Sequence, residues 1–212
     1  MPTVHAPAAQ HLVLDGVDWS SYGRWLRLLN DRPSLRLTYD RGTLEIMNLT
    51  YEHESWGHFL GRIVIALTEE LGLPIAGGGS TTFRKRKRRR GLESDECYWI
   101  ANEARVRGKK RLDLRTDPPP DLAIEIDITH SSLNRMSIYA DLGIPEIWHL
   151  DAQGITFHAL GSDGQYTKSE RSLAFPSLAP ADLARFVALR GQIDENAVIR
   201  QFRSWVRERQ NQ

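Results

Sequence analysis

Residues 118–151 combine two strand patterns and a helix pattern in one short stretch, PPPDLAIEIDITHSSLNRMSIYADLGIPEIWHLD. Apolar and polar residues alternate over 121–128, a helical spacing follows over 132–142, and 145–151 is again typical of a strand. Two strands joined by one helix pair in parallel, with the helix on one face of the sheet. The sequence therefore predicts an α/β protein with a mixed sheet flanked by helices.

The segments before this unit predict a helix, a hairpin and a second helix. Residues 19–31 place their large apolar side chains on one helical face, and 35–48 alternate around a central Arg-Gly pair like a hairpin. Residues 51–72 carry the most regular helical stripe, with Gly72 at the expected end. The start of the chain is thus predicted as helix, two antiparallel strands and a long helix.

The other expected elements are short strands and a helical tail. The helix of the parallel unit is expected to start at Ser131 or Ser132 and to end at Gly143. Further strands are expected in 73–83, 94–100, 154–160 and 165–170, and two tail helices at 180–189 and 194–209. The expected organisation is an N-terminal tail (1–18), one α/β domain (19–190) and a C-terminal helix (191–212).

Composition narrows the class of protein. The 212 residues are 41% hydrophobic, which is enough for one well-packed domain. Cys97 is the only cysteine, so an internal disulfide framework and a cysteine-based zinc site are both excluded. The N-terminal sequence lacks the features of a signal peptide, and no apolar stretch approaches the roughly 20 residues of a membrane span. We expect a soluble cytoplasmic protein.

Positive charge is concentrated in one segment, although the net charge is only +1. Residues 84–111 hold 12 of the 28 Lys and Arg residues against four acids, so this segment carries +8 and the remainder −7. Such a segment can follow a phosphate backbone, or it can be a solvated hairpin. The candidate nucleic-acid contacts are Arg84, Lys85, Arg86, Lys87, Arg88, Arg89, Arg90, Lys109, Lys110 and Arg111.

The strand at 121–128 carries acids on one face, Asp121, Glu125 and Asp127, with no cation between them. One interpretation is the solvated face of an edge strand. The other is a metal site, because like charges repel and acids alone suit Mg²⁺ (or Mn²⁺). With ~3.3 Å per residue, Glu125 and Asp127 can share an ion, whereas Asp121 lies about 13 Å from Glu125. A further ligand must come from elsewhere, and Asp95 at the head of a strand is the candidate.

An acid, then a strand with Glu-X-acid, then a basic residue on the next helix is the pattern of the PD-(D/E)XK nucleases. Residues 91–151 resemble the Uma-type family of restriction-endonuclease-like proteins, and the resemblance extends over roughly 20–190. It implies a restriction-endonuclease-like sheet with extra antiparallel strands and a C-terminal helical tail. It also implies that Asp95 and Glu125 are the acids of the motif and hold the metal.

The sequence departs from this motif at two positions. Ser94 replaces the proline, and Asp127 replaces the lysine. In the family a lysine often lies on the next helix instead, where this chain has Arg135. Because a helical side chain leans toward its own N-terminus, we expect Arg135 to reach back over the strand and to clamp a phosphate. Asp127, or a metal-bound hydroxide, then takes the proton of the attacking water.

The resemblance also aligns Glu52 with a helix acid that many of these nucleases add to the site. Glu52 lies four residues before Trp56, so it extends the inward stripe of its helix. The alternative is that Glu52 only complements the positive end of that helix. His53 beside it is more typical of a hydrogen-bonding residue than of a ligand.

Three functions are compatible with these features. The first is a metal-dependent endonuclease that hydrolyses DNA, with Glu52, Asp95, Glu125, Asp127 and Arg135 as the candidate catalytic residues. The second is a catalytically degenerate nuclease fold that only binds nucleic acid, and the third is a structural or regulatory partner. A homodimer is expected for cutting both strands, with Ile199, Phe202 and Val206 as the candidate contact. Repulsion at the acidic strand predicts that Glu125→Gln, without metal, is at least as stable as the parent.

Overall fold

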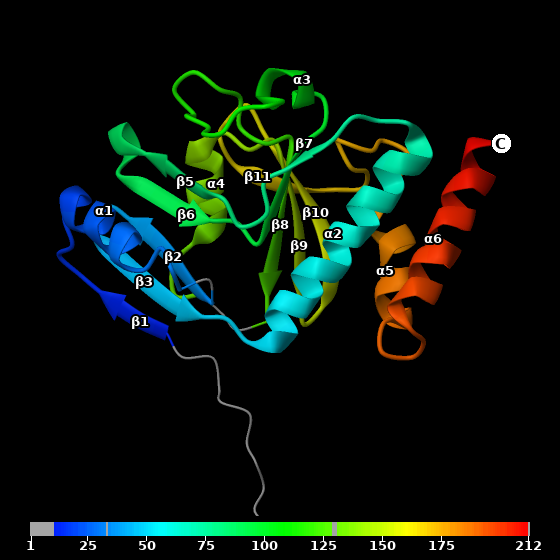
Figure 1. Cartoon of the computed structure of the whole chain (residues 1–212), viewed down its shortest axis with the longest axis horizontal. Coiled ribbons are helices and arrows are strands. Elements are labelled where there is room, and N and C mark those ends of the chain that lie inside the picture. The colour runs from blue at the N-terminus through cyan, green and yellow to red at the C-terminus, as the bar shows by residue number, and fades with distance from the viewer. Residues whose placement is uncertain (1–10, 33, 129–130, 212) are drawn as a thin grey trace, which may run out of the picture.

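The computed structural model describes residues 11–32, 34–128 and 131–211. Within these ranges the chain forms two sheets and six α-helices, arranged as Figure 1 shows. The larger sheet has the strand order β11-β10-β9-β8-β7-β4. Its strands are β4 (Ala76–Gly77), β7 (Glu96–Trp99), β8 (Leu122–Asp127), β9 (Glu146–Asp151), β10 (Gly154–Leu160) and β11 (Tyr166–Ser169). The predicted α/β class is confirmed.

The predicted parallel unit lies at the centre of the larger sheet. Strand β8 pairs in parallel with β9, where Glu125 lies opposite His149, and antiparallel with β7. Helix α4 (Arg135–Leu142) connects the two parallel strands and ends at Gly143, whose φ of 84° is left-handed. The expected start at a serine is wrong: Asn134 caps α4 by accepting a hydrogen bond from the Ser137 amide at 3.0 Å.

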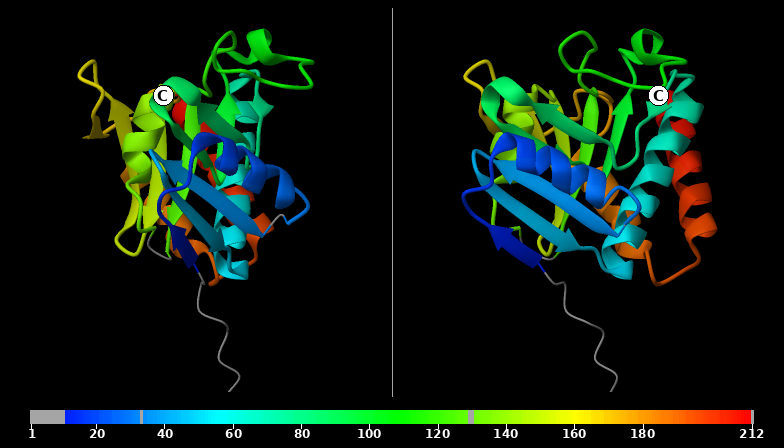
Figure 2. Two further views of the ribbon diagram at one scale, coloured as in Figure 1. Left: turned by 90° about the vertical axis from the view of Figure 1, so that its left-hand side faces the viewer. Right: turned by 60° about the vertical axis from the view of Figure 1, so that its left-hand side comes forward.

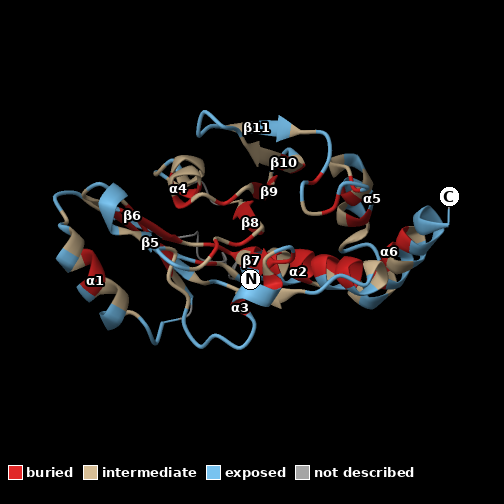
Figure 3. Cartoon of the chain, turned by 90° about the horizontal axis from the view of Figure 1, so that it is seen from above, coloured by how far each residue is buried: buried red, intermediate tan, exposed pale blue. Residues whose placement is uncertain are grey.

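Helices cover both faces of strand β8, as Figure 3 shows for α2 and α4. Leu122, Ile124 and Ile126 pack in one core with α2 (Tyr51–Leu71), α5 (Pro180–Leu189) and α6 (Glu195–Gln210). Ala123 packs in the other core, with α4. The solvated edge strand is therefore ruled out: β8 is an interior strand, and Glu125 is only 5% exposed.

The smaller sheet has the order β1-β3-β2-β6-β5, and α1 (Trp19–Leu28) lies across it (Figure 2). Its strands are β1 (His11–Leu14), β2 (Leu35–Asp40), β3 (Thr43–Asn48), β5 (Thr82–Lys85) and β6 (Arg90–Glu93). The predicted hairpin is the β2–β3 pair. Part of the expected tail is a strand, since β1 pairs with β3, while residues 1–10 lie outside the described residues.

Helix α2 connects β3 of the smaller sheet to β4 of the larger sheet, packs against β8, and places its first turn at the candidate site. Thr50 caps it by accepting the His53 amide at 3.3 Å, and Gly72, with a φ of 64°, ends it as predicted. The helix is 21 residues long. None of the helices in the described ranges has the length and hydrophobicity that a membrane span requires.

The C-terminal helix α6 packs against α2 within the same chain. Phe202 is fully buried, and Val206 and Ile199 are 3% and 7% exposed. These three side chains belong to the domain core, so the expectation that they form a contact between two copies is wrong. An amphipathic pattern indicates an apolar face, but it does not indicate which surface covers that face.

Candidate active site

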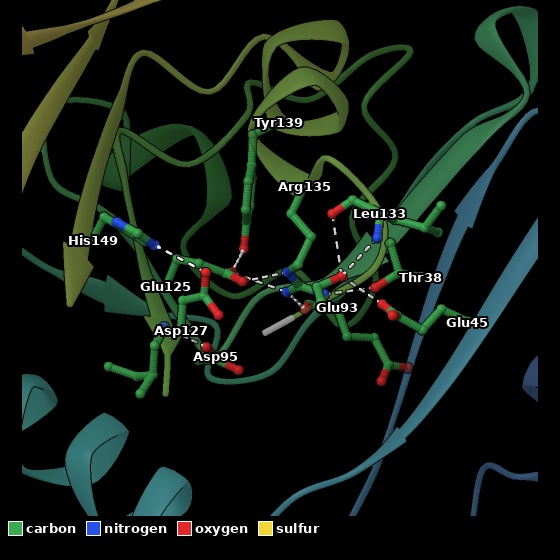
Figure 4. Close-up of polar contacts among 12 residues, drawn as sticks. Thr38, Glu45, Glu93, Asp95, Glu125, Asp127, Leu133, Arg135, Tyr139 and His149 are labelled. Carbon is green, nitrogen blue, oxygen red and sulfur yellow. Dashed lines mark hydrogen bonds and ion pairs between the residues drawn. The ribbon is translucent and has the colours of Figure 1, made fainter. Parts of the chain in front are cut away.

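Asp95, Glu125 and Asp127 line one small cavity, about 20 Å³ in volume, where the two sheets meet. That volume is room for about one water molecule or ion. Its walls come from β2 and β3 of the smaller sheet, the first turn of α2, strand β8 and the start of α4. Figure 4 shows the central side chains of this carboxylate cavity.

Asp95, just before β7, is tied to the strand that carries Glu125. Its Oδ2 accepts a hydrogen bond from the Ile126 amide at 2.8 Å and lies 3.4 Å from His53 Nε2. Burial acts to raise the pKa of Asp95, but the hydrogen bond and charge of His53, with help from Arg135, outweigh it and lower that pKa. Asp95 is therefore an ionised, buried carboxylate held next to β8.

Glu125 is held on both oxygens by side chains of α4. Arg135 Nε donates to Oε1, and Nη2 donates to Oε2 at 2.9 Å, so the contact is bidentate. The Tyr139 hydroxyl donates to Oε2 at 2.6 Å. Burial raises the pKa of Glu125 and the charge of Asp95 adds to this, while Arg135 opposes it. Glu125, for which the sequence indicated no neighbouring cation, is thus paired with Arg135 of its own chain.

Arg135 also joins the two sheets. Its Nη1 donates to Thr38 Oγ1 at 2.6 Å, and Nη2 donates to the Glu93 carbonyl at 2.7 Å. The side chain leans back over β8 as predicted. In this structure the anion that the guanidinium group meets is the buried Glu125 carboxylate. That Arg135 contacts a phosphate stays a prediction.

Asp127, at the end of β8, is the most accessible of the three acids, with a side chain that is 36% exposed. His149 of β9 lies between two acids: its Nε2 is 3.8 Å from Asp127 Oδ2, and its Nδ1 is 3.7 Å from Asp151 Oδ2. The contact with Asp127 raises the pKa of His149, although burial opposes it. Sequence analysis missed His149; the signal was its register opposite Glu125 in the parallel pair.

The first turn of α2 contributes His53 and not Glu52. Glu52 is exposed, so the expectation that it faces inward is wrong. His53 is 3% exposed and lies on the buried face of α2, which also carries Gly57 and Leu60. Glu52 is one residue earlier in the helix, so its side chain points away from that face. Burial acts to lower the pKa of His53, but the hydrogen bond and charge of Asp95 outweigh it and raise that pKa. His53 is the hydrogen-bonding residue that was expected.

Glu45 at the cavity and Asp121 at the start of β8 have structural roles. Glu45 of β3 is 1% exposed and accepts hydrogen bonds from Ser131 Oγ, from Ser132 N at 2.8 Å and from Ser132 Oγ at 2.7 Å. The two serines thus fix the segment before α4 to the smaller sheet. Asp121 accepts from the Ile100 and Asn102 amides at 2.7 and 3.0 Å, which agrees with its assignment to the start of the strand and not to an ion.

The basic segment divides into buried and exposed cations. Arg90 is 7% exposed and donates to Asp40 and Asp141, while Lys85 Nζ donates to the Asp141 carbonyl at 2.6 Å. Lys109 pairs with Asp117. These three cations hold the fold together. Arg88 is exposed, and its Nε lies 3.6 Å from Asp141 Oδ1. The exposed positions that have no ion pair with a described residue are Arg84, Arg86, Lys87, Arg89, Lys110 and Arg111.

The cavity suits a hard divalent cation in its chemistry. Asp95 and Glu125 repel each other, as the effect of Asp95 on the pKa of Glu125 indicates, and a cation between carboxylates relieves that repulsion. Both contacts of Asp95 use Oδ2. Within the described residues no three His, Cys, Asp or Glu side chains stand in a metal-binding arrangement.

A mixed sheet whose central strand carries Glu125, beside an antiparallel strand headed by Asp95 and with helices on both faces, is a restriction-endonuclease-like fold. A model of the Uma2 family, described as "Putative restriction endonuclease", matches residues 19–188. The chain belongs to this family. No curated protein matches the chain.

Proposed function

We propose that the chain is a metal-dependent endonuclease that hydrolyses DNA phosphodiester bonds at the carboxylate cavity. The observation that supports this most is the hydrogen bond from Ile126 N to Asp95 Oδ2, which holds the acids of two strands in one cavity. Asp95 and Glu125 are the residues that would hold Mg²⁺ or Mn²⁺. The ion would supply charge stabilisation and a more acidic water.

The roles of the chain's own residues follow from their contacts. Arg135 and Tyr139 fix both oxygens of Glu125, so this carboxylate cannot rotate away from the cavity. Asp127 stands at the accessible end of β8 and accepts the proton of the attacking water. His149, 3.8 Å from Asp127, keeps that carboxylate oriented.

A second candidate function is a nuclease fold that binds DNA without cutting it. It is favoured by two features: an acid, Asp127, stands at the position of the motif lysine, and Arg135 already balances the charge of Glu125. In this reading the site is complete without an ion, and exposed cations such as Arg84 and Arg111 supply the affinity for DNA.

Plasmid cleavage separates the two functions. The wild type should nick and linearise supercoiled plasmid with Mg²⁺ or Mn²⁺ and leave it intact in EDTA. Asp95→Asn should lose at least about a hundredfold in rate, in line with one lost electrostatic stabiliser of the transition state. Glu52→Gln, at an exposed acid, is the matched control and should cut normally. DNA binding without any metal-dependent cleavage would favour the second function.

A homodimer that acts in the cytoplasm is part of the same proposal. Cutting both strands of a duplex takes two sites, and one chain has one carboxylate cavity in its described residues. The contact has to come from a surface other than the buried face of α6. Sedimentation velocity at micromolar concentration should give a species of twice the chain mass, and a monomer alone would contradict the dimer.

A further inference from the structure

A second, larger hollow opens beside the carboxylate cavity. It has a volume of about 900 Å³ and lies between α1, β2, β5 and the loop that contains Arg111. Five arginines line this groove: Arg27, Arg32, Arg36, Arg84 and Arg111. Its two acids are Asp31 and Glu93, so the groove carries an excess of positive charge.

Two of these arginines converge on one point. Arg27 of α1 and Arg84 of β5 place their Nη1 atoms 3.7 and 3.8 Å from the position that a Cβ on Gly23 would occupy. Like charges repel, and neither arginine has an ion pair with any described residue. Two guanidinium groups that approach the same point in this way are suited to share an anion such as a phosphate.

The groove borders the carboxylate cavity. Arg36 lines both hollows. Glu93, in the wall of the groove, accepts a hydrogen bond from Arg135 on its carbonyl oxygen, and Arg135 holds Glu125. A polymer that lies in the groove is therefore separated from the proposed metal ligands only by the side chains of Arg36 and Arg135.

The rest of the lining distinguishes a polymer from a small anion. The cations are spread over α1, two strands and a loop, which is more than one phosphate requires, and Leu26, Leu29 and Leu35 add apolar surface between them. A phosphate backbone with its sugars offers this alternation of charge and apolar surface. The Glu93 carboxylate accepts from Thr82 Oγ1 at 2.8 Å and from Leu37 N at 3.4 Å, so both of its oxygens already have partners within the protein.

We propose that the groove binds the sugar-phosphate backbone of the DNA strand that enters the carboxylate cavity, with Arg27 and Arg84 sharing one phosphate. This rests on the proposed function, because it names the path of the same substrate. It assigns binding to α1 and β5, close to the site, in addition to the basic hairpin formed by β5 and β6, whose exposed tip is residues 86–89.

The test measures binding without cleavage. Fluorescence anisotropy in EDTA with a labelled DNA single strand and the matching duplex compares the wild type with Arg27→Ala/Arg84→Ala. The control is Arg24→Ala/Arg200→Ala, which removes two exposed arginines outside the groove, one of them also on α1. The groove variant should lose about tenfold or more in affinity, and its log-log salt slope should fall by about 0.7–0.9 per lost phosphate contact. The control should stay within about twofold.

Gly23 provides a second variant pair. Gly23→Ala adds a Cβ at ordinary contact distance from both guanidinium groups and should bind like the wild type. Gly23→Asp places a carboxylate between them and should weaken binding as the double variant does. The two DNA forms show which of them enters the groove.

The outcomes for this proposal and for the nuclease proposal are separate. Equal affinities and salt slopes for the groove variant and its control would overturn the groove, whatever the cleavage assay gives. If the wild type does not cleave DNA but the groove variant still loses affinity, the groove proposal is supported and the nuclease proposal is overturned.

Discussion

Arg135 and Glu125 form a buried bidentate ion pair that joins the start of α4 to the middle of β8. Arg135 Nη2 lies 2.9 Å from Glu125 Oε2, Nε contacts Oε1, and the two side chains are 12% and 7% exposed. The pair balances the charge of the central strand inside the protein. It also decides which variants of the site retain a stable fold.

Removing either partner leaves the other charge buried and unpaired. Glu125→Gln and Arg135→Met should each lower the free energy of unfolding by about 3–5 kcal/mol in urea denaturation. This reverses the expectation from the sequence that Glu125→Gln is at least as stable as the parent, because that expectation omitted Arg135. Tyr139→Phe, which removes one hydrogen bond to the same carboxylate, should cost about 1–3 kcal/mol. Loss of under about 0.5 kcal/mol in Glu125→Gln would show that the pair contributes nothing.

The contact between His53 and Asp95 predicts a dependence of stability on pH. Asp95 has a folded pKa below its ordinary 3.8, so its contribution is present above pH 3.8 and is lost as pH falls through the lower value. His53 has a folded pKa above its ordinary 6.5, so its contribution is complete below pH 6.5 and is lost as pH rises through the higher value.

Melting temperatures of the wild type and His53→Gln between pH 5 and pH 9 check this. The wild type should lose stability relative to the variant on the alkaline side of pH 6.5. Parallel curves across this range would contradict a charged His53 in the folded protein.

Much of the fold could be predicted because local patterns determine it. Three such patterns lie within short segments: the alternation of apolar and polar residues in β8 and β9, the apolar face of α2, and the glycines that end α2 and α4. Asp95 and Glu125 could be named from the motif, and the structure brings both into one cavity.

The details that could not be predicted depend on contacts between distant segments. The charge on Glu125 is balanced by an arginine ten residues away, and Glu45 meets Ser131 across 86 residues of chain. The choice between Glu52 and His53 depends on a shift of one helical position, which a stripe as broad as that of α2 does not resolve. The face of α6 was identified as apolar, but its partner, α2, lies far away in the sequence.

Glu45 should control the order of the segment before α4. In the parent, the amide and the hydroxyl of Ser132 both donate to the Glu45 carboxylate. Glu45→Gln replaces one acceptor oxygen with an NH₂ group, so about 1–3 kcal/mol of stability should be lost. Hydrogen exchange should show faster exchange at Ser132 than in the parent. Glu52→Gln, at an exposed glutamate, should change stability by under about 0.5 kcal/mol. Unchanged protection of Ser132 would show that the serines are held by other contacts.

The basic hairpin should separate into a structural and a binding part. Replacing Arg86, Lys87, Arg88 and Arg89 with Ser should leave stability within about 0.5 kcal/mol and flatten the salt dependence of DNA binding by up to ~0.9 in log slope per lost contact. Arg90→Met should instead cost about 2 kcal/mol or more, since Asp40 and Asp141 lose their shared partner. An unchanged salt slope in the first variant would mean that the tip only faces solvent.

Calorimetric titration of Mn²⁺ into the wild type and Asp95→Asn tests the metal site most directly. The asparagine carbonyl oxygen can keep the contacts that Oδ2 makes with Ile126 N and His53, so the variant should fold while losing a negatively charged ligand. We expect one binding event per chain in the wild type and none in Asp95→Asn at the same concentrations. Equal heats in the two proteins, or no binding in either, would contradict a metal ion at the carboxylate cavity.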